Sequence, residues 1–344
     1  MKTDFTQGYD TKVGNDEMTL SEIAKNLEIS VTTVSRAISG KGRISEATRE
    51  KVSLYLEQNH IEKKVKESGY AKKQTRNICI TLPREDNYAE LPYFQKVLLG
   101  LCDYFSVYEF NVIPVKTSLY HIGDLENIVS KHKIDGVVLT RVMGNDPAIG
   151  FLQSRGVPFI VIGSYEDANV CQVDVDQKNG CRDLTNILLR MGIKKIALFC
   201  ADFTQNVTKN RYLGFCQAYE ENGIRLKEEF VFENTADPSI AEKLTETMLK
   251  EDIECIACMD DNICINVVRA LRKFGVEIPK DMKVVSFYNS ILLDGFYPPI
   301  SCVDFNIKEV SEVTGKLMLS LLEEKRSPKR ILLGYNIILK DSTK

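Results

Sequence analysis

A short segment near the N-terminus combines the side chains that a DNA-reading helix needs. Residues 30–39 read SVTTVSRAIS, so hydroxyl groups and one arginine are interleaved with small apolar side chains. Short polar side chains let a helix approach base edges in the major groove, and an arginine can bind a guanine or a phosphate. The pattern alone also fits a helical bundle with an exposed polar face. We expect an outer face of Val31, Thr32, Thr33, Ser35 and Arg36, and an inner face of Val34, Ala37 and Ile38.

Metal binding and catalysis find little support in the residue types and their spacing. The ten cysteines are scattered, and Cys255 and Cys258 would point to opposite faces of a strand. With three histidines and no metal-ligand spacing, we expect buried, reduced thiols and neither a metal nor a cofactor. Nucleotide-binding, zinc-protease and hydrolase motifs are absent, and the adjacent Asp260 and Asp261 fit the start of a helix. We therefore expect no enzyme activity.

Three short helices are predicted around the candidate recognition segment. Thr19 and Glu22 form a capping-box pattern, Ser30 is expected to cap the second helix, and Ser45 the third. A turn of about three residues joins the first two, which is the geometry of a helix-turn-helix. The side chains expected in the interior of this head are Leu20, Ile23, Ala24, Leu27, Val34, Ala37, Ile38, Val52, Tyr55 and Leu56.

Two segments beside the head lack a helical pattern of their own. Residues 1–17 are polar and predict a disordered extension. Residues 60–77 hold six Lys or Arg and two Glu with few apolar side chains. This composition predicts a basic linker, or a helix that forms only against a partner.

The remaining sequence alternates between apolar strands and amphipathic helices, which predicts parallel, doubly wound α/β sheets. The number of predicted strands is larger than that of one typical sheet. We therefore expect two lobes with a ligand cleft between them at the carboxyl ends of the strands. Strands are expected over 78–83, 110–115, 136–140, 158–163, 171–175, 195–200, 255–259, 283–288 and 335–340. Helices are expected over 93–107, 121–132, 146–155, 177–191, 207–222, 239–250, 261–274 and 307–324.

The charge of the chain is unevenly distributed. The sequence has 344 residues and a formal net charge of −3. Residues 19–76 hold 12 basic and 7 acidic side chains, whereas residues 77–344 hold 31 basic and 37 acidic ones. A basic head on an acidic body indicates that only the head and linker bind a polyanion. Because the sequence shows neither a membrane-length apolar run nor a signal peptide, we expect a cytoplasmic protein.

Residues 19–52, TLSEIAKNLEISVTTVSRAISGKGRISEATREKV, resemble the DNA-binding head of the LacI/GalR family of bacterial transcriptional regulators. The similarity includes TVSR at 33–36 and GKGR at 40–43. One departure is Glu28, which replaces the family's usual turn glycine and is strained if its φ is positive. The DNA contacts that the resemblance implies for the head are Leu20, Ser30, Val31, Thr32, Thr33, Ser35, Arg36, Ser39, Arg43, Ser45 and Thr48.

The linker follows the family pattern less closely. Family members have a hinge helix that ends in Leu-Ala and wedges into the minor groove, and the corresponding pair here is Tyr70-Ala71. Gly69 disfavours that helix by about 1 kcal/mol, although an aromatic ring can still act as a wedge. The alternative is a basic tether whose lysines, Lys64 among them, contact phosphates. Both interpretations of the linker remain open.

Residues 78–340 resemble the effector-binding core of the same family, which is itself similar to periplasmic sugar-binding proteins. The motif RYLGF at 211–215 implies that Arg211 binds the effector. Asp260 and Tyr288 stand at two further cleft positions of the family, where Asn and Asp are usual. The segment TRVMGNDPAI at 140–149 resembles the maltose and oligosaccharide branch of the family. This resemblance implies Arg141 as a further residue of the cleft. A carbohydrate effector is implied, but not in the standard monosaccharide mode.

The expected fold class is α/β, with a three-helix helix-turn-helix head joined by a hinge to a two-lobed, periplasmic-binding-protein-like core. We expect a homodimeric regulator, most simply a repressor, that binds a near-palindromic DNA operator and a small-molecule effector. The alternative is a soluble sugar-binding protein without regulatory DNA binding. The expected units are the extension 1–17, the head 18–59, the hinge 60–77, an N-lobe of about 78–175 plus 305–334, and a C-lobe of about 176–304 plus 335–344.

Overall fold

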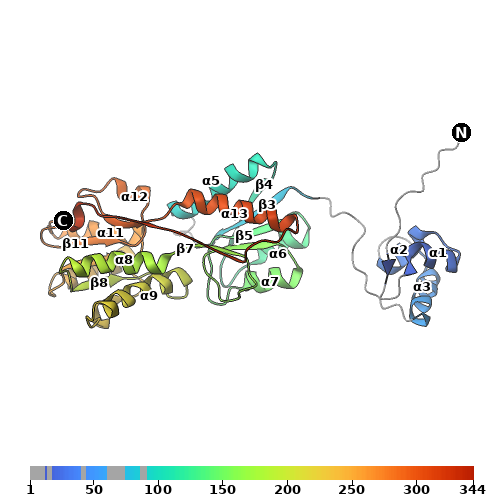
Figure 1. Cartoon of the computed structure of the whole chain (residues 1–344), viewed down its shortest axis with the longest axis horizontal. Coiled ribbons are helices and arrows are strands. Elements are labelled where there is room, and N and C mark those ends of the chain that lie inside the picture. The colour runs from blue at the N-terminus through green and yellow to red at the C-terminus, as the bar shows by residue number, and fades with distance from the viewer. Residues whose placement is uncertain (1–11, 14–17, 40–43, 60–73, 86–90) are drawn as a thin grey trace. The chain divides into compact units, whose positions relative to one another are not determined.

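The computed structural model describes residues 12–13, 18–39, 44–59, 74–85 and 91–344 (Figure 1). The chain divides into two compact units, residues 1–73 and 74–344, and each is described by itself. Most of the extension expected over 1–17, the loop 40–43 and most of the linker expected over 60–77 lie outside the described residues. Within the extension, Lys12–Val13 is a strand, β1, which pairs antiparallel with β2, Met18–Thr19.

The head contains the three predicted helices. They are α1, Leu20–Leu27, α2, Val31–Ser39, and α3, Glu46–Gln58. As predicted, Ser30 caps α2, because its Oγ accepts from the amide of Thr33 at 3.1 Å. Ser45 caps α3 in the same way through the amide of Thr48. The buried side chains of the head are Ile23, Ala24, Leu27, Val34, Val52 and Leu56.

The first sheet of the core is parallel throughout, in the order β13-β7-β6-β5-β3-β4. Most side chains of its inner strands are apolar and buried, because helices cover both faces. In Figure 1, α5 and α13 lie on one face and α6 and α7 on the other. The strands are β3, Asn77–Pro83, β4, Asn111–Thr117, β5, Gly136–Leu139, β6, Phe159–Ile162, β7, Gln172–Val175, and β13, Arg330–Leu333. The helices are α5, Pro92–Val107, α6, Gly123–Ser130, α7, Pro147–Arg155, and α13, Ile307–Leu322.

The second sheet has the order β14-β12-β11-β10-β8-β9, and only β14 runs antiparallel. Its helices α8 and α9 lie so close that a Cβ on Gly214 would meet the carbonyl oxygen of Lys178. The strands are β8, Ile196–Phe199, β9, Val231–Phe232, β10, Cys255–Cys258, β11, Lys283–Ser286, β12, Ser301–Asp304, and β14, Asn336–Ile338. The α-helices are α8, Gln177–Arg190, α9, Asn206–Glu221, α10, Pro238–Met248, α11, Asp261–Lys273, and α12, Ile291–Asp294. Two short 3₁₀ turns, Glu228–Phe230 and Asp341–Thr343, complete this lobe.

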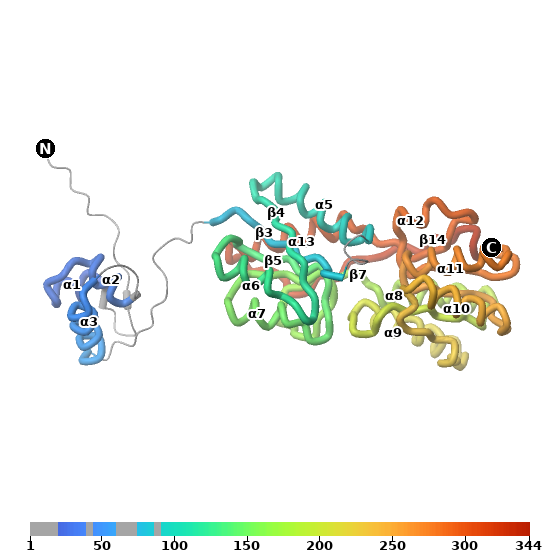
Figure 2. Tube along the Cα trace, turned by 180° about the vertical axis from the view of Figure 1, so that it is seen from behind, coloured from blue at the N-terminus to red at the C-terminus, as the bar shows by residue number. Residues whose placement is uncertain are grey.

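The chain passes between the two sheets three times, after β7, after β12 and after β13 (Figure 2). The predicted α/β fold with two doubly wound lobes is therefore confirmed. Every predicted strand and helix of the core is present, with ends that shift by up to two residues. The sequence patterns missed β9, β12, β13 and α12, which have two to four residues each.

Candidate functional site

Helix α2 presents a polar face to solvent. Thr32, Ser35 and Arg36 are exposed, whereas Val34 on the opposite face is fully buried. Helical periodicity produces this division, since positions 32, 35 and 36 lie on one side of the helix. The exposed face carries two hydroxyls and one guanidinium, which can donate to base edges or to phosphates.

The turn before α2 contains Glu28, the residue that replaces the family's usual glycine. Glu28 has a φ of 54°, in the left-handed region that glycine enters without cost. The turn is held by the amide of Ile29, which donates to the carbonyl of Ala24 at 3.0 Å. The condition under which the sequence implied strain at Glu28, a positive φ, is therefore met.

The other expected DNA contacts have different surroundings. Leu20 and Val31 are partly buried against the head core, so much of their surface serves packing. The hydroxyls of Ser30 and Thr33 lie 2.7 Å apart, and those of Ser45 and Thr48 lie 2.6 Å apart, because each pair forms a helix cap. The side chains of Ser39, Arg43, Lys64, Tyr70 and Ala71 lie outside the described residues.

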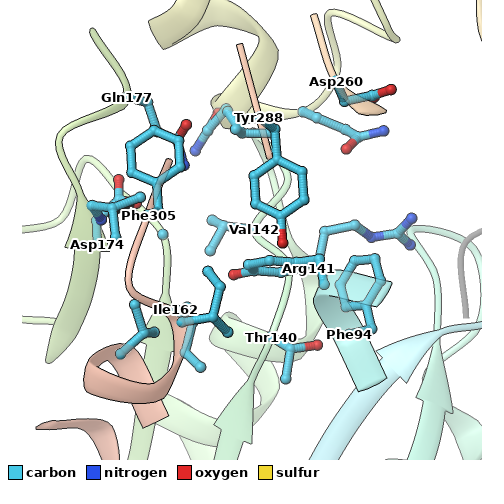
Figure 3. A pocket seen from close by; sticks show the side chains of 18 of the residues that line it. Phe94, Thr140, Arg141, Val142, Ile162, Asp174, Gln177, Asp260, Tyr288 and Phe305 are labelled. Atoms are coloured by element: carbon cyan, nitrogen blue, oxygen red, sulfur yellow. Dashed lines mark hydrogen bonds between the residues drawn. The ribbon is translucent and has the colours of Figure 1, made fainter. Parts of the chain in front are cut away.

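The second unit contains a pocket between its two sheets (Figure 3). Its lining comes from the carboxyl ends of parallel strands and the segments that follow them, where ligands bind in doubly wound sheets. The cavity volume is about 130 Å³, which corresponds to on the order of ten water molecules and suits a small polar ligand. Polar lining residues include Thr140, Arg141, Ser164, Asp174, Gln177, Gln205, Asn206, Arg211, Asp260, Asp261 and Tyr288.

Arg211 lies on α9 and is 7% exposed. Its Nε donates to Oε1 of Gln177 at 2.8 Å, and its Nη1 donates to the carbonyl of Met259 at 2.5 Å. The guanidinium carbon is 5.8 Å from the centre of the Tyr288 ring. These contacts hold the guanidinium in one orientation at the pocket wall.

Tyr288 follows β11 and is only 4% exposed. Figure 3 shows its ring reaching into the pocket with the hydroxyl directed toward the interior. Its ring stacks on Phe305 with centroids 6.4 Å apart and meets Tyr93 edge to face. Burial, followed by the negative charge of Asp261, raises the pKa of the Tyr288 hydroxyl, which therefore stays protonated.

Three aspartates line the pocket. Asp260 caps α11, since its Oδ1 accepts from the amide of Ile263 at 2.9 Å. Burial and the neighbouring Asp261 raise the pKa of Asp260 to about 6. Burial also raises the pKa of Asp174, which lies in β7, to about 6. The same cause raises the pKa of Asp261, which is 3% exposed.

Arg141 follows β5 and forms an ion pair with Glu85, with Nη2 and Oε2 2.9 Å apart. The arginine side chain is 11% exposed and the glutamate side chain 46% exposed. Much of the positive charge of Arg141 is therefore already balanced within the N-lobe.

Polar contacts join the two lobes beside the pocket. Met143 of the N-lobe pairs with Gln205 of the C-lobe in an isolated antiparallel bridge. The side-chain amide of Asn206 donates to the carbonyl of Ser164 at 2.9 Å, and that of Asn210 donates to the Ser164 hydroxyl at 2.6 Å. These contacts hold the lobes together at the pocket.

The four residues expected to bind an effector, Arg141, Arg211, Asp260 and Tyr288, all line this one pocket. Their role in binding stays a prediction. The sequence interpretation did not single out Tyr93, Asp174, Gln177 or Asn206. Asp174 and Gln177 flank the end of a predicted strand, so the rule that ligands bind at carboxyl strand ends could have found them.

Other kinds of site find no support in the described part of the chain. All ten cysteines are described and free, and Cys255 and Cys258 are buried, as expected for reduced thiols. Within the described ranges, no group of three or more His, Cys, Asp or Glu could hold a metal ion. No described helix is long and apolar enough to span a membrane.

Two family models match the sequence. The model of bacterial regulatory proteins of the lacI family covers residues 19–72, and that of the periplasmic binding protein-like domain covers residues 185–343. Among curated relatives, the transcriptional regulator RegA of Clostridium saccharobutylicum is 24% identical, over 94% of this chain and 98% of that protein. Catabolite control protein A of Staphylococcus xylosus is 22% identical, over 95% and 99% of the two chains.

Solved structures agree on the fold. A transcriptional regulator CelR–cellobiose complex aligns with a TM-score of 0.73 at 22% identity, covering 95% of this chain and all of the other. The regulator CcpA of Lactococcus lactis aligns with a TM-score of 0.70 at 22% identity, covering 78% and 99% of the two chains.

The head and the core together define a DNA-binding transcriptional regulator with a ligand-binding body. Residues 19–72 thus match the head of the lacI family of bacterial regulatory proteins, and residues 185–343 match a periplasmic binding protein-like domain.

Proposed function

We propose that the protein is a repressor whose helix α2 enters the major groove of a near-palindromic operator. The exposed Thr32, Ser35 and Arg36 on one face of α2 support this role. The functional units are then the head 18–59, the linker 60–77 and the core 78–344. The linker acts either as a minor-groove wedge at Tyr70-Ala71 or as a basic phosphate tether.

We propose that two copies of the chain form the active dimer through one side of the core. Leu99 and Val107 on α5 are 64% and 76% exposed, and Ile291 and Tyr297 at α12 are 66% and 84% exposed. Figures 1 and 2 both draw α5 and α12 along the same side of the core. Large apolar side chains that gather on one side of a molecule are typical of an interface between proteins.

We further propose that a sugar bound in the pocket controls operator binding. The observation that carries this proposal is a pocket lined by both lobes, with an oriented Arg211 and an available Tyr288 hydroxyl. Guanidinium, carboxylate and aromatic groups together suit a polyhydroxylated ligand. The relative that was solved with cellobiose supports the same class of effector.

Control by the effector requires that the ligand favours one arrangement of the two lobes over another. The bridge between Met143 and Gln205 and the contacts of Asn206 and Asn210 with Ser164 are the contacts that such a change would make or break. A differential affinity equivalent to about 1–3 kcal/mol is typical of such coupling. The protein then acts in the cytoplasm, where operators lie, and has no catalytic activity.

A gel-shift titration with the DNA upstream of the protein's own gene tests this function. We expect nanomolar binding that depends on Arg36 and changes when an effector sugar is added. Unchanged affinity with every sugar of a broad panel would contradict effector control. The alternative, a sugar-binding protein without regulatory DNA binding, predicts sugar binding by calorimetry but no specific shift of any DNA fragment.

A further inference from the structure

Two buried polar atoms in the pocket lack a hydrogen-bond partner among the described residues. They are the hydroxyl oxygen of Tyr288 and Oδ2 of Asp261. Both side chains are more than nine-tenths buried, and both line the pocket. A buried polar atom without a partner is costly, and such atoms in a binding site are commonly completed by the ligand. The ionised carboxylate of Asp261 can only accept a hydrogen bond, whereas the Tyr288 hydroxyl can accept one and also donate one. A ligand N–H or O–H group can therefore complete both oxygens.

The charges around the pocket do not balance. Asp174, Asp260 and Asp261 all line it, and none of them lies within 4.0 Å of a cationic nitrogen in an ion pair of the described residues. Arg211 directs Nε to Gln177 and Nη1 to the carbonyl of Met259, so these donors do not reach a carboxylate. A buried carboxylate without a paired cation is unfavourable, so these side chains give the pocket an excess of negative charge.

Arg141, the second cation of the pocket, does not restore the balance. Its guanidinium forms an ion pair with Glu85, so the pair together contributes no net charge. The pocket lining with Glu85 therefore holds four carboxylates against two guanidinium groups. A ligand that carries a phosphate would add negative charge to this set.

Aromatic rings form much of the remaining wall. Tyr93, Phe94, Tyr288 and Phe305 all line the pocket. Ring faces are attractive to cations as well as to the apolar faces of sugars. The aromatic walls and the carboxylates thus both favour a ligand that carries a positive charge.

We propose that the effector of this pocket carries a protonated amine beside its hydroxyl groups, as an amino sugar does. The amine contacts the carboxylates, and its N–H groups complete the unpartnered oxygens of Asp261 and Tyr288. This inference rests on the proposed function, in which the pocket binds the effector, and it deepens that function by naming the ligand's charge. Burial is the main cause of the raised pKa values of Asp174 and Asp260, and the positive charge of Arg211 offsets it only in part.

Isothermal titration calorimetry on the full chain tests the proposal with matched ligands at pH 7.5. Glucosamine, galactosamine and mannosamine are each compared with their N-acetyl and 6-phosphate derivatives, and cellobiose is added as a neutral sugar. We expect at least one amine to bind tenfold or more tightly than its N-acetyl and phosphate counterparts. N-acetylation keeps the ring and hydroxyls but removes the positive charge, so the comparison isolates the amine.

A carboxylate variant provides the second measurement. Asp261→Asn should reduce the preference for the amine over its N-acetyl counterpart at least fivefold. Asp237→Asn is the matched control, because Asp237 caps α10 and does not line the pocket, and it should leave the preference unchanged. Equal loss in both variants would overturn the proposal.

The possible results separate the two levels of inference. Binding of cellobiose or of an N-acetyl or phosphorylated sugar, with no amine preferred, overturns the amine proposal and leaves a sugar-controlled regulator standing. Absence of binding by every sugar of the panel overturns the amine proposal and contradicts sugar control as well. Operator binding, measured separately by gel shift, tests the regulator itself.

Discussion

The rings of Tyr93 and Tyr288 meet edge to face in the pocket, with centroids 6.0 Å apart and ring planes at 82°. Tyr93 belongs to α5 of the N-lobe, whereas Tyr288 follows β11 of the C-lobe. The contact therefore joins the two lobes directly at the ligand site. A ligand that contacts either ring also changes the free-energy difference between arrangements of the lobes.

The first prediction concerns the hydroxyl of Tyr288. Tyr288→Phe should raise the free energy of unfolding of the core by about 1 kcal/mol, because it removes a buried oxygen without a partner. The same change should weaken effector binding, since the ligand loses its hydrogen bond to that hydroxyl. Urea unfolding followed by circular dichroism measures the first effect, and calorimetry measures the second. A destabilised variant would show that the hydroxyl already has a partner.

Arg211 should be needed as an arginine and not only as a positive charge. Arg211→Lys keeps the charge but cannot donate to both Gln177 and the carbonyl of Met259 in the observed geometry. We expect it to abolish the effector response of operator binding in a gel shift. Basal operator affinity should change less than twofold. A normal response in the lysine variant would move the effector site elsewhere.

Arg36 is expected to carry operator recognition. Arg36→Ala should weaken operator binding about 5- to 150-fold, equivalent to the roughly 1–3 kcal/mol of a good base contact. The matched control is Lys25→Ala, which removes an exposed positive charge from α1. Fluorescence anisotropy at constant salt compares the two. Equal losses in both variants would indicate a general electrostatic effect and not recognition by α2.

The turn at Glu28 offers a stabilising substitution. Glu28→Gly should slow hydrogen exchange in α1 and α3 by a factor that corresponds to about 1 kcal/mol, because glycine adopts the observed φ without strain. Lys25→Gly, three residues earlier within α1, should have the opposite effect. Hydrogen–deuterium exchange of the full chain measures both. Faster exchange in Glu28→Gly would show that the turn is not strained.

The pH dependence of stability should reflect Asp260. Its pKa is raised to about 6, so the folded chain keeps a proton between pH 4 and 6 that the unfolded chain loses. Stability contributed by this group is therefore present below about pH 4 and is lost as pH rises toward 6. As the pH rises from 4.5 to 7.5, the free energy of unfolding of the Asp260→Asn variant should increase by on the order of 1–2 kcal/mol relative to that of the unchanged protein.

Asparagine is the suitable replacement because it preserves the cap of α11. The charged groups that face Asp260 are Asp261 and Arg211. Asp174 shifts in the same direction and remains in the variant, so part of the pH dependence should persist. Urea unfolding at the two pH values measures the difference. An identical pH profile in both proteins would contradict a raised pKa for Asp260.

The sequence alone was sufficient for features that depend on local periodicity. Alternation and helical spacing predicted the long strands and helices, and the caps at Ser30 and Ser45 followed from residue type. The outer face of α2, with Arg36, also follows from a period of 3.6 residues. The resemblance of the head to a known family also places Glu28 in the turn between the first two helices, where its φ is 54°.

Only the tertiary structure decided which side chains share the pocket. Tyr93 and Tyr288 are far apart in the sequence, and their contact depends on strand order and on three passages of the chain between two sheets. The donors of Arg211 are directed to Gln177 and Met259, and Asp261 and Tyr288 keep unpartnered oxygens. Periodicity is a local property, whereas burial, charge balance and hydrogen-bond satisfaction depend on neighbours brought together from distant segments. The sequence therefore predicted the residue types of the site, but only the tertiary structure showed which of their polar atoms lack a partner and which charges are unbalanced.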